Sequence, residues 1–214
     1  MTLVLYDYWR SSAAYRVRIG LNLKGLAYEQ QAVNLLAGAQ GEAAYGEVNP
    51  QHLIPSLETP DGVLTQSLAI LEWLEETHPE PPLLPKDALG RATVRAMCAA
   101  IAADIHPLNN LRVLNALRGE FGAENPQVSA WIARWIGEGF AALEQLISRH
   151  GGAYAYGDAP TLADVLLVPQ VYSARRYKVD VAAYPRLIAA AERAAELAPV
   201  AAAHPDRQPD AQPA

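Results

Sequence analysis

The sequence has a single cysteine among its 214 residues, so no disulfide can form within the chain. One cysteine fits a protein of a reducing compartment, and we expect a cytoplasmic protein. Cys98 lies in a long helical pattern, where a small buried residue is the better interpretation and a nucleophile the weaker one. No His or Cys cluster has the spacing of metal ligands, so the sequence predicts no metal site.

Long apolar runs and an excess of positive charge are lacking as well. No run approaches the roughly 20 apolar residues of a membrane-spanning helix. The N-terminus does not combine a basic stretch with an apolar one, so we expect neither a membrane partner nor a signal peptide. Lys and Arg number 17 against 23 for Asp and Glu, which gives a net charge of −6. This acidic balance argues against a nucleic-acid partner.

The apolar content is high enough for a full core, because hydrophobic residues make up 51% of the chain. The first part of the sequence alternates between strand and helix patterns. Strands are predicted at 3–8, 28–33, 54–57 and 63–65, helices at 11–23 and 67–77, and a polar segment without a clear pattern at 37–48. The first strand–helix–strand crossover predicts a parallel pair of strands, and the Asp61-Gly62 turn predicts an antiparallel pair.

Four prolines in the segment 78–90 mark a domain boundary, because neither helix nor strand continues through them. The rest of the chain has helical patterns at 89–117 with a kink or break at Pro107, and at 126–150, 161–177 and 184–197. Thr161 and Asp164 form a capping box for the third of these. The sequence therefore predicts an α/β domain over 1–82, an all-helical domain over 87–198, and a frayed Pro- and Ala-rich tail over 199–214.

Two serines, Ser11 and Ser12, stand where the first strand turns into the first helix. A helix N-terminus presents unpaired N–H groups and a partial positive charge, and is a place to hold an anion. Ser11 can simply cap the helix. Alternatively, its hydroxyl donates to a bound anion and lowers the pKa of a thiol, which must come from a cofactor because the chain has no cysteine there.

Two further features fit the second interpretation. Ile54-Pro55 precedes a predicted strand, in a setting where thioredoxin-like domains use a cis peptide bond that exposes the preceding backbone to an extended peptide. Gln66-Ser67 opens the last helix of the first domain, where helix N–H groups can take a carboxylate. Each feature is weak alone, but together they describe a groove for a small anionic peptide with a free thiol.

The stretch SSAAYRVRIGLNLKG resembles the signature of the zeta-class glutathione transferases. The resemblance spans residues 3–197 and includes NPQHLIPSLE, QSLAILEWLEE, PEPPLLP, DIHPLNNLRVL and YGDAPTLADVLLVPQVYSARRYKVD. It implies a thioredoxin-like N-terminal domain, an all-helical C-terminal domain, a homodimer, and glutathione as a cofactor regenerated in each turnover. The sequence departs from the signature at Ala13, where most of the class has cysteine, which puts in doubt any side activity that depends on that thiol.

The resemblance also implies roles for particular residues. Ser11, with Ser12 beside it, would hydrogen-bond the glutathione thiolate, and the backbone of Ile54 ahead of cis Pro55 would pair with the cysteinyl unit. Gln66 and Ser67 would hold the γ-glutamyl end. Further positions that match glutathione contacts of the class are Gln40, His106, Asn110 and Arg112.

A substrate with two carboxylates needs arginines, because the planar guanidinium binds a carboxylate bidentately. Arg10 is the first candidate, since it is adjacent to Ser11. Arg175 and Arg176 are the second, and because neighbouring helical residues point about 100° apart, only one of them is expected to face the site. Arg175 is slightly favoured. Arg16 and Arg18 are instead expected to be structural ion-pair partners.

The function implied by the resemblance is glutathione-dependent cis–trans isomerisation. A thiolate adds to an alkene conjugated with a carbonyl, the resulting single bond rotates, and the thiolate leaves. We expect conversion of maleylacetoacetate to fumarylacetoacetate in tyrosine and phenylalanine breakdown. The alternatives are maleylpyruvate isomerisation in a gentisate pathway, which these residues do not separate from the first, a general glutathione transferase, and a non-catalytic binding module.

Overall fold

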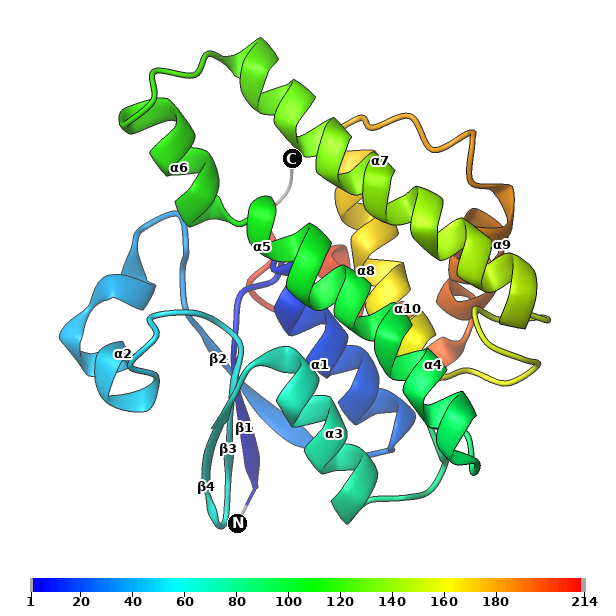
Figure 1. Cartoon of the computed structure of the whole chain (residues 1–214). Coiled ribbons are helices and arrows are strands. Elements are labelled where there is room, and N and C mark those ends of the chain that lie inside the picture. Colours follow the sequence, from blue (N-terminus) through cyan, green and yellow to red (C-terminus); the bar gives the residue numbers. More distant parts are fainter. Residues whose placement is uncertain (1, 213–214) are drawn as a thin grey trace. The chain divides into compact units, whose positions relative to one another are not determined.

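The computed structural model describes residues 2–212 and divides the chain into two compact units. The first unit contains the residues up to Pro82 together with those from Glu196 onward, and the second contains Leu83–Ala195 (Figure 1). Within residues 2–212, no helix is both long and apolar enough to cross a membrane.

The first unit is built on a four-stranded mixed sheet in the order β2-β1-β3-β4. Its strands are β1 (Leu3–Asp7), β2 (Tyr28–Ala32), β3 (Ser56–Thr59) and β4 (Gly62–Thr65). β1 and β2 are parallel, whereas β3 runs antiparallel to both β1 and β4. The parallel pair and the antiparallel hairpin predicted from the sequence are therefore confirmed.

Two helices, α1 (Ser12–Leu23) and α3 (Ser67–Thr77), lie side by side against this sheet (Figure 1). They approach closely at Gly20, where a Cβ atom would lie 2.3 Å from the side chain of Leu71. α1 ends at Leu23 and is followed by Gly25, whose φ of +67° is a conformation that glycine adopts readily. The polar segment without a clear pattern contains a short 3₁₀ helix, η1 (Ala39–Gly41), and α2 (Ala43–Val48).

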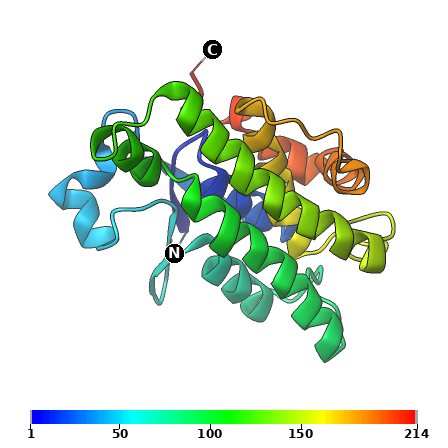
Figure 2. The same cartoon turned by 45° about the horizontal axis from the view of Figure 1, so that its top comes forward.

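The second unit is all helical. It comprises α4 (Ala88–Ala99), a π-helical turn η2 (Ala100–Ile105), α5 (His106–Leu108), α6 (Leu111–Gly119), α7 (Asn125–His150), α8 (Leu162–Arg176) and α9 (Pro185–Ala195). The green run of α4 and η2 and the yellow-green α7 follow the same diagonal in Figure 2, and α7 packs against η2. Gly139 of α7 lies so close to η2 that a Cβ there would be 2.3 Å from Ile105.

The break predicted at Pro107 is present, but its form was not predicted. The N–H of His106 donates to the carbonyl of Ile101, five residues back, which is the bond of a π turn. Proline has no N–H for the next bond, and helical pairing ends soon after, at Leu108. The π turn therefore pairs the last N–H before Pro107.

α8 is the core of the helical unit and is buried over most of its length. The predicted capping box at its start is confirmed, and Asp164 does more than cap. Its carboxylate accepts hydrogen bonds from the N–H of Ala155 (2.8 Å), the N–H of Thr161 (2.8 Å) and the hydroxyl of Thr161 (3.0 Å). The start of α8 is thereby tied to the loop that precedes it.

The prediction of a frayed tail is wrong for residues 199–212. This segment contains α10 (Ala198–Ala202) and a 3₁₀ helix η3 (Pro205–Arg207), and it packs on α1 of the first unit. This order has no local pattern in the sequence, because the segment is held by contacts to residues near the start of the chain. The last part of the predicted tail, 213–214, lies outside the described residues.

We expect Asp164→Ala to lower the free energy of unfolding by about 2–4 kcal/mol, because three buried donors lose their acceptor. Urea denaturation checks this. Asp158→Ala is a matched control, since Asp158 accepts one bond from Ala153 at an exposed place in the same loop. A similar decrease in the free energy of unfolding in both variants would contradict the prediction.

Asp164 should also give the protein a measurable pH dependence. Burial raises the pKa of Asp164 to about 6, although hydrogen bonds from Ala155 and Thr161 act in the opposite direction. Between about pH 4 and pH 6 the folded chain therefore holds a proton that the unfolded chain has released, and the free energy of unfolding falls as pH rises. We expect Asp164→Asn to lack this contribution.

Candidate active site

The sheet register brings three of the predicted site segments to one edge of the first unit. Tyr6 of β1 pairs with Ser56 of β3, and Ser56 pairs with Thr65 of β4. These pairs lie where β1 ends, β3 begins and β4 ends. The segments that carry Arg10 and Ser11, Ile54-Pro55, and Gln66-Ser67 therefore leave the sheet at neighbouring positions.

Ser11 is the N-cap of α1, and its Oγ accepts a hydrogen bond from the N–H of Ala14 at 3.3 Å. A hydroxyl carries one donor besides its lone pairs, so the O–H of Ser11 can still donate to an anion at the helix start. Ser12 and Ala13 are buried in the first turn behind it. Arg10 precedes the cap, and its guanidinium lies over the ring of Trp9 at 5.2 Å.

The Ile54-Pro55 peptide bond is cis, as predicted. Ile54 lies beyond the last ladder pair of β3, so its backbone is outside the sheet. The preceding carbonyl, that of Leu53, accepts from the hydroxyl of Tyr45 (2.8 Å) and the side-chain amide of Asn49 (2.7 Å). Burial raises the pKa of Tyr45, which favours the protonated, donating form. These two donors hold the chain in place as it enters the cis bond.

Gln66 and Ser67 open α3 with an unusual backbone. Gln66 has φ +69° and ψ 114°, a region that residues other than glycine occupy only under strain. Its exposed side-chain amide donates to Oε1 of Gln51 at 2.8 Å. Ser67 is buried and its Oγ accepts from Arg16 at 3.3 Å, so its hydroxyl, like that of Ser11, keeps a donor.

Two residues that the sequence interpretation did not single out support this edge. Gln51 orients the amide of Gln66, as described above. His52 contacts the carbonyl of Gln40 through Nδ1 at 2.8 Å and so fixes η1 against the loop before Ile54. The side-chain Oε1 of Gln40 is buried with no hydrogen-bond partner among the described residues. Both supporting residues lie in NPQHLIPSLE, so only the family resemblance could have drawn attention to them.

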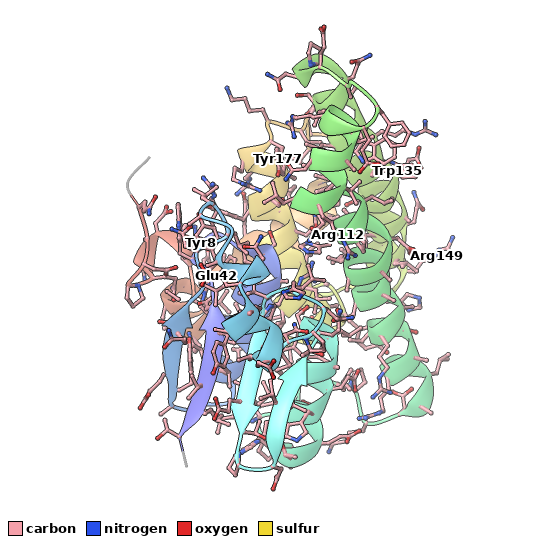
Figure 3. All side chains as sticks on the ribbon, turned by 90° about the vertical axis from the view of Figure 1, so that its left-hand side faces the viewer. Tyr8, Glu42, Arg112, Trp135, Arg149 and Tyr177 are labelled. Atoms are coloured by element: carbon pink, nitrogen blue, oxygen red, sulfur yellow. The ribbon has the colours of Figure 1, made fainter. Side chains whose placement is uncertain are left out.

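The helical unit holds the remaining predicted glutathione contacts close together in the chain. His106 begins α5 directly after the π turn, and Asn110 is the N-cap of α6, with its Oδ1 accepting from the N–H of Arg112 at 3.1 Å. Arg112, labelled in Figure 3, is exposed in the first turn of α6. The glutathione-binding role of these three residues stays a prediction.

The two arginines at the end of α8 differ in their surroundings. Arg175 forms an ion pair with Glu192 of α9, and both side chains are exposed. Arg176 stacks on Tyr177, which Figure 3 labels, with its guanidinium 4.4 Å from the ring centroid. Arg175 already has a carboxylate partner, whereas the only interaction of Arg176 among the described contacts is with an uncharged ring. This difference favours Arg176 over Arg175, opposite to the preference drawn from the sequence.

A mixed sheet with a helix start and a cis-proline loop at one edge, followed by an all-helical unit, is the architecture of a known family. The model of the glutathione S-transferase N-terminal domain matches residues 5–82, and that of the C-terminal domain matches residues 129–193. The chain belongs to the glutathione S-transferase family.

Within this family the similar proteins carry two related names. The chain is 48% identical to maleylacetoacetate isomerase of Pseudomonas aeruginosa, over 96% of this chain and 97% of that one. The holo structure of a maleyl pyruvate isomerase, a bacterial zeta-class member, matches with a TM-score of 0.96 and 48% identity, over 98% of this chain and 100% of that one.

A third relative has been solved with ligands. Maleylacetoacetate isomerase of Anaeromyxobacter dehalogenans with bound glutathione in the active site matches with a TM-score of 0.90 and 52% identity, over 99% of this chain and 98% of that one. The same protein has also been solved with bound dicarboxyethyl glutathione and citrate.

The strained backbone of Gln66 gives a prediction that separates binding from stability. We expect Gln66→Ala and Gln66→Gly both to weaken glutathione binding about tenfold, because both lose the side-chain amide. Only the glycine variant relieves the strain at φ +69°, so its thermal midpoint should exceed that of the alanine variant. Calorimetric titration and thermal unfolding measure the two effects. Unchanged binding in both variants would contradict a role of the side chain.

Proposed function

We propose that the protein is a glutathione-dependent cis–trans isomerase that converts maleylacetoacetate to fumarylacetoacetate. The observation that carries this proposal is the convergence of the Ser11 helix start, the cis Ile54-Pro55 loop and the Gln66-Ser67 helix start at one edge of the sheet. Together these segments offer the groups that an extended, anionic, thiol-bearing tripeptide requires.

The donors present at this edge fit glutathione. The N-termini of α1 and α3 supply backbone N–H groups and partial positive charge for a thiolate and a carboxylate. Ser11 and Ser67 each accept one hydrogen bond from the protein and keep a hydroxyl donor. Ile54 lies outside the ladder of β3, which suits pairing with the cysteinyl backbone. Gln40, through its buried side-chain oxygen, offers an acceptor near the same loop.

When bound, glutathione supplies a thiolate that adds reversibly to the conjugated alkene, so that the former double bond can rotate. The protein needs no base of its own in the reaction beyond what keeps this thiol ionised. The hydroxyl of Ser11 donates a hydrogen bond to the sulfur, and the start of α1 lowers the thiol pKa by favouring the charged form. Ser12, buried in the first turn of α1, lies beside Ser11.

The substrate carboxylates are held by arginines in this proposal. Arg10 adjoins Ser11, and its contact with the Trp9 ring restricts its guanidinium without neutralising it. Arg176 is the partner for the distal carboxylate, for the reason given above. A relative bound to dicarboxyethyl glutathione supports a site that accepts a dicarboxylate next to the sulfur. The predicted glutathione contacts His106, Asn110 and Arg112 belong to the same proposal.

Maleylpyruvate isomerisation is the second candidate function. Relatives with either name match this chain at 48% identity over nearly its full length, and the two substrates differ little in shape. The homodimer, the cytoplasmic location and the place in aromatic amino-acid breakdown stay predictions. Retention of Ser11, Gln66 and Ser67 disfavours a non-catalytic binding module.

The decisive experiment offers the purified protein maleylacetoacetate and maleylpyruvate separately, each with and without glutathione, and follows the fumaryl product by absorbance. We expect glutathione-dependent turnover, faster with maleylacetoacetate. Ser11→Ala should lower kcat by about 10²-fold, since the thiolate loses a hydrogen-bond donor. Ser129→Ala, an exposed serine of α7, should leave kcat unchanged. Bound glutathione without turnover of either substrate would exclude the isomerase.

Paired substitutions distinguish the two arginines of α8. We expect Arg176→Gln to raise the KM for the dicarboxylate substrate about tenfold or more, through loss of a charged hydrogen bond. Arg175→Gln should change KM little, because it removes only an exposed ion pair with Glu192. The KM for glutathione is the internal control and should not change in either variant. A larger rise in this KM for Arg175→Gln than for Arg176→Gln would instead favour Arg175, as the sequence interpretation does.

A further inference from the structure

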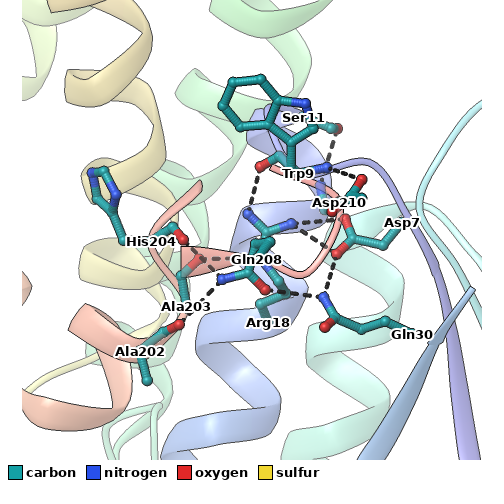
Figure 4. Close-up of polar contacts among 11 residues, drawn as sticks. Asp7, Trp9, Ser11, Arg18, Gln30, Ala202, Ala203, His204, Gln208 and Asp210 are labelled. Carbon is teal, nitrogen blue, oxygen red and sulfur yellow. Dashed lines mark hydrogen bonds and ion pairs between the residues drawn. The ribbon is translucent and has the colours of Figure 1, made fainter. Parts of the chain in front are cut away.

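The peptide groups on the two sides of Trp9 are fixed from distant parts of the first unit. The N–H of Trp9 donates to Oδ2 of Asp210 at 3.0 Å, and its carbonyl accepts from Nη2 of Arg18 at 2.9 Å (Figure 4). Trp9 stands directly before Arg10 and Ser11. One of its two anchors therefore comes from the opposite end of the sequence.

Arg18 connects this turn to the rest of the unit. It is fully buried, and its Nη1 forms an ion pair with both carboxylate oxygens of Asp7, at 2.7 and 2.8 Å. Its Nε donates to the carbonyl of Ala203 at 3.1 Å. The end of β1, the middle of α1 and the C-terminal segment thus meet on one guanidinium.

The C-terminal segment has its own fixed conformation next to Asp210. Gln208 is buried, and its Nε2 donates to the carbonyls of Ala202 (3.1 Å) and His204 (2.8 Å). Its Oε1 accepts from Gln30 of β2 at 3.0 Å, and the same amide of Gln30 donates to Asp7 at 2.8 Å. Asp210 is therefore presented by a backbone that is anchored two residues earlier.

The turn held in this way is the one that leads into α1. The N–H of Ser11 donates to the carbonyl of Tyr8 at 2.9 Å, so Trp9 and Arg10 are the two residues inside the turn. Fixing both peptide groups of Trp9 fixes the direction in which the chain enters α1. The positions of the Arg10 side chain and the Ser11 hydroxyl follow from that direction.

We propose that Asp210 is a positioning residue that holds the turn carrying Arg10 and Ser11 in its active geometry. The inference rests on the proposed function of these two residues. Asp210 acts through the hydrogen bond to Trp9, and any neutral acceptor of the same shape can replace it. A negative charge close to a thiolate would raise the thiol pKa, so geometry is the contribution and charge is not.

The test compares Asp210→Ala with Asp210→Asn, and uses Asp206→Ala as the control that removes the same charge from an exposed position of the same segment. The pKa of glutathione bound to each variant is measured from the ultraviolet absorbance of its thiolate. We expect the alanine variant to raise this pKa and to lower kcat about ten- to hundredfold, because misplacement of a reacting group by a fraction of an ångström is costly. The KM for glutathione should change little, since the loops of Ile54 and Gln66 are untouched.

Asp210→Asn and Asp206→Ala should both have the thiol pKa and the kcat of the unchanged protein. Hydrogen exchange gives a readout that needs no substrate: the amides of Trp9 and Ser11 should lose protection in the alanine variant alone. A fall in thermal stability with unchanged thiol pKa and unchanged kcat would overturn the proposal, because Asp210 would then only anchor the segment.

Failure of the proposed function has a different signature. It would appear in the unchanged protein as bound glutathione with an ordinary thiol pKa, or as no turnover. The exchange experiment then decides the positioning role by itself. Protection of Trp9 and Ser11 that is lost only in Asp210→Ala supports the role, and protection retained in that variant overturns it.

Discussion

The buried ion pair between Asp7 and Arg18 is the interaction on which the first unit depends. Removing two charges from water is costly and is offset only when their geometry and remaining hydrogen bonds are nearly complete. Here the guanidinium binds Asp7 through both of its oxygens and reaches the carbonyls of Trp9 and Ala203. The second partner of Asp7, Gln30, belongs to β2. The Asp7–Arg18 ion pair therefore connects the sheet, α1 and the C-terminal segment.

From this ion pair the candidate site is built by topology. Mixed pairing places the end of β1, the beginning of β3 and the end of β4 side by side, so three short loops emerge together. Two of them lead directly into helix N-termini, and the third carries a cis peptide bond. The strained backbone of Gln66 and the cap of Ser11 are local features, but they become a site only because the strand register aligns them.

Features with a local cause could be predicted from the sequence. The helix that starts after Ser11, the Asp61-Gly62 hairpin and the capping box at Thr161 each follow from a few neighbouring residues, and the structure contains all three. Arg18 was also expected to be an ion-pair partner, which its contact with Asp7 confirms. The cis bond before Pro55 followed from position in a thioredoxin-like pattern.

Features with a distant cause could not be predicted. The order of the C-terminal segment depends on Arg18 and Gln30, far away in sequence, and the Pro- and Ala-rich composition suggested the opposite. The ion pair of Arg175 needs α9 folded back on α8, and the sequence alone could not rank it against Arg176. The π turn before Pro107 follows from a backbone requirement that side-chain periodicity does not record.

The assignment of residues from Glu196 onward to the first unit has a consequence for biosynthesis. The ribosome synthesises the two parts of this unit separately, with the whole helical unit between them. While the part from Glu196 onward is still inside the exit tunnel, Arg18 lacks the carbonyl of Ala203 and Trp9 lacks the carboxylate of Asp210. The turn before α1 therefore reaches its final form only after the segment with Ala203 and Asp210 has left the tunnel, and a nascent chain that lacks this segment has an incomplete version of the turn.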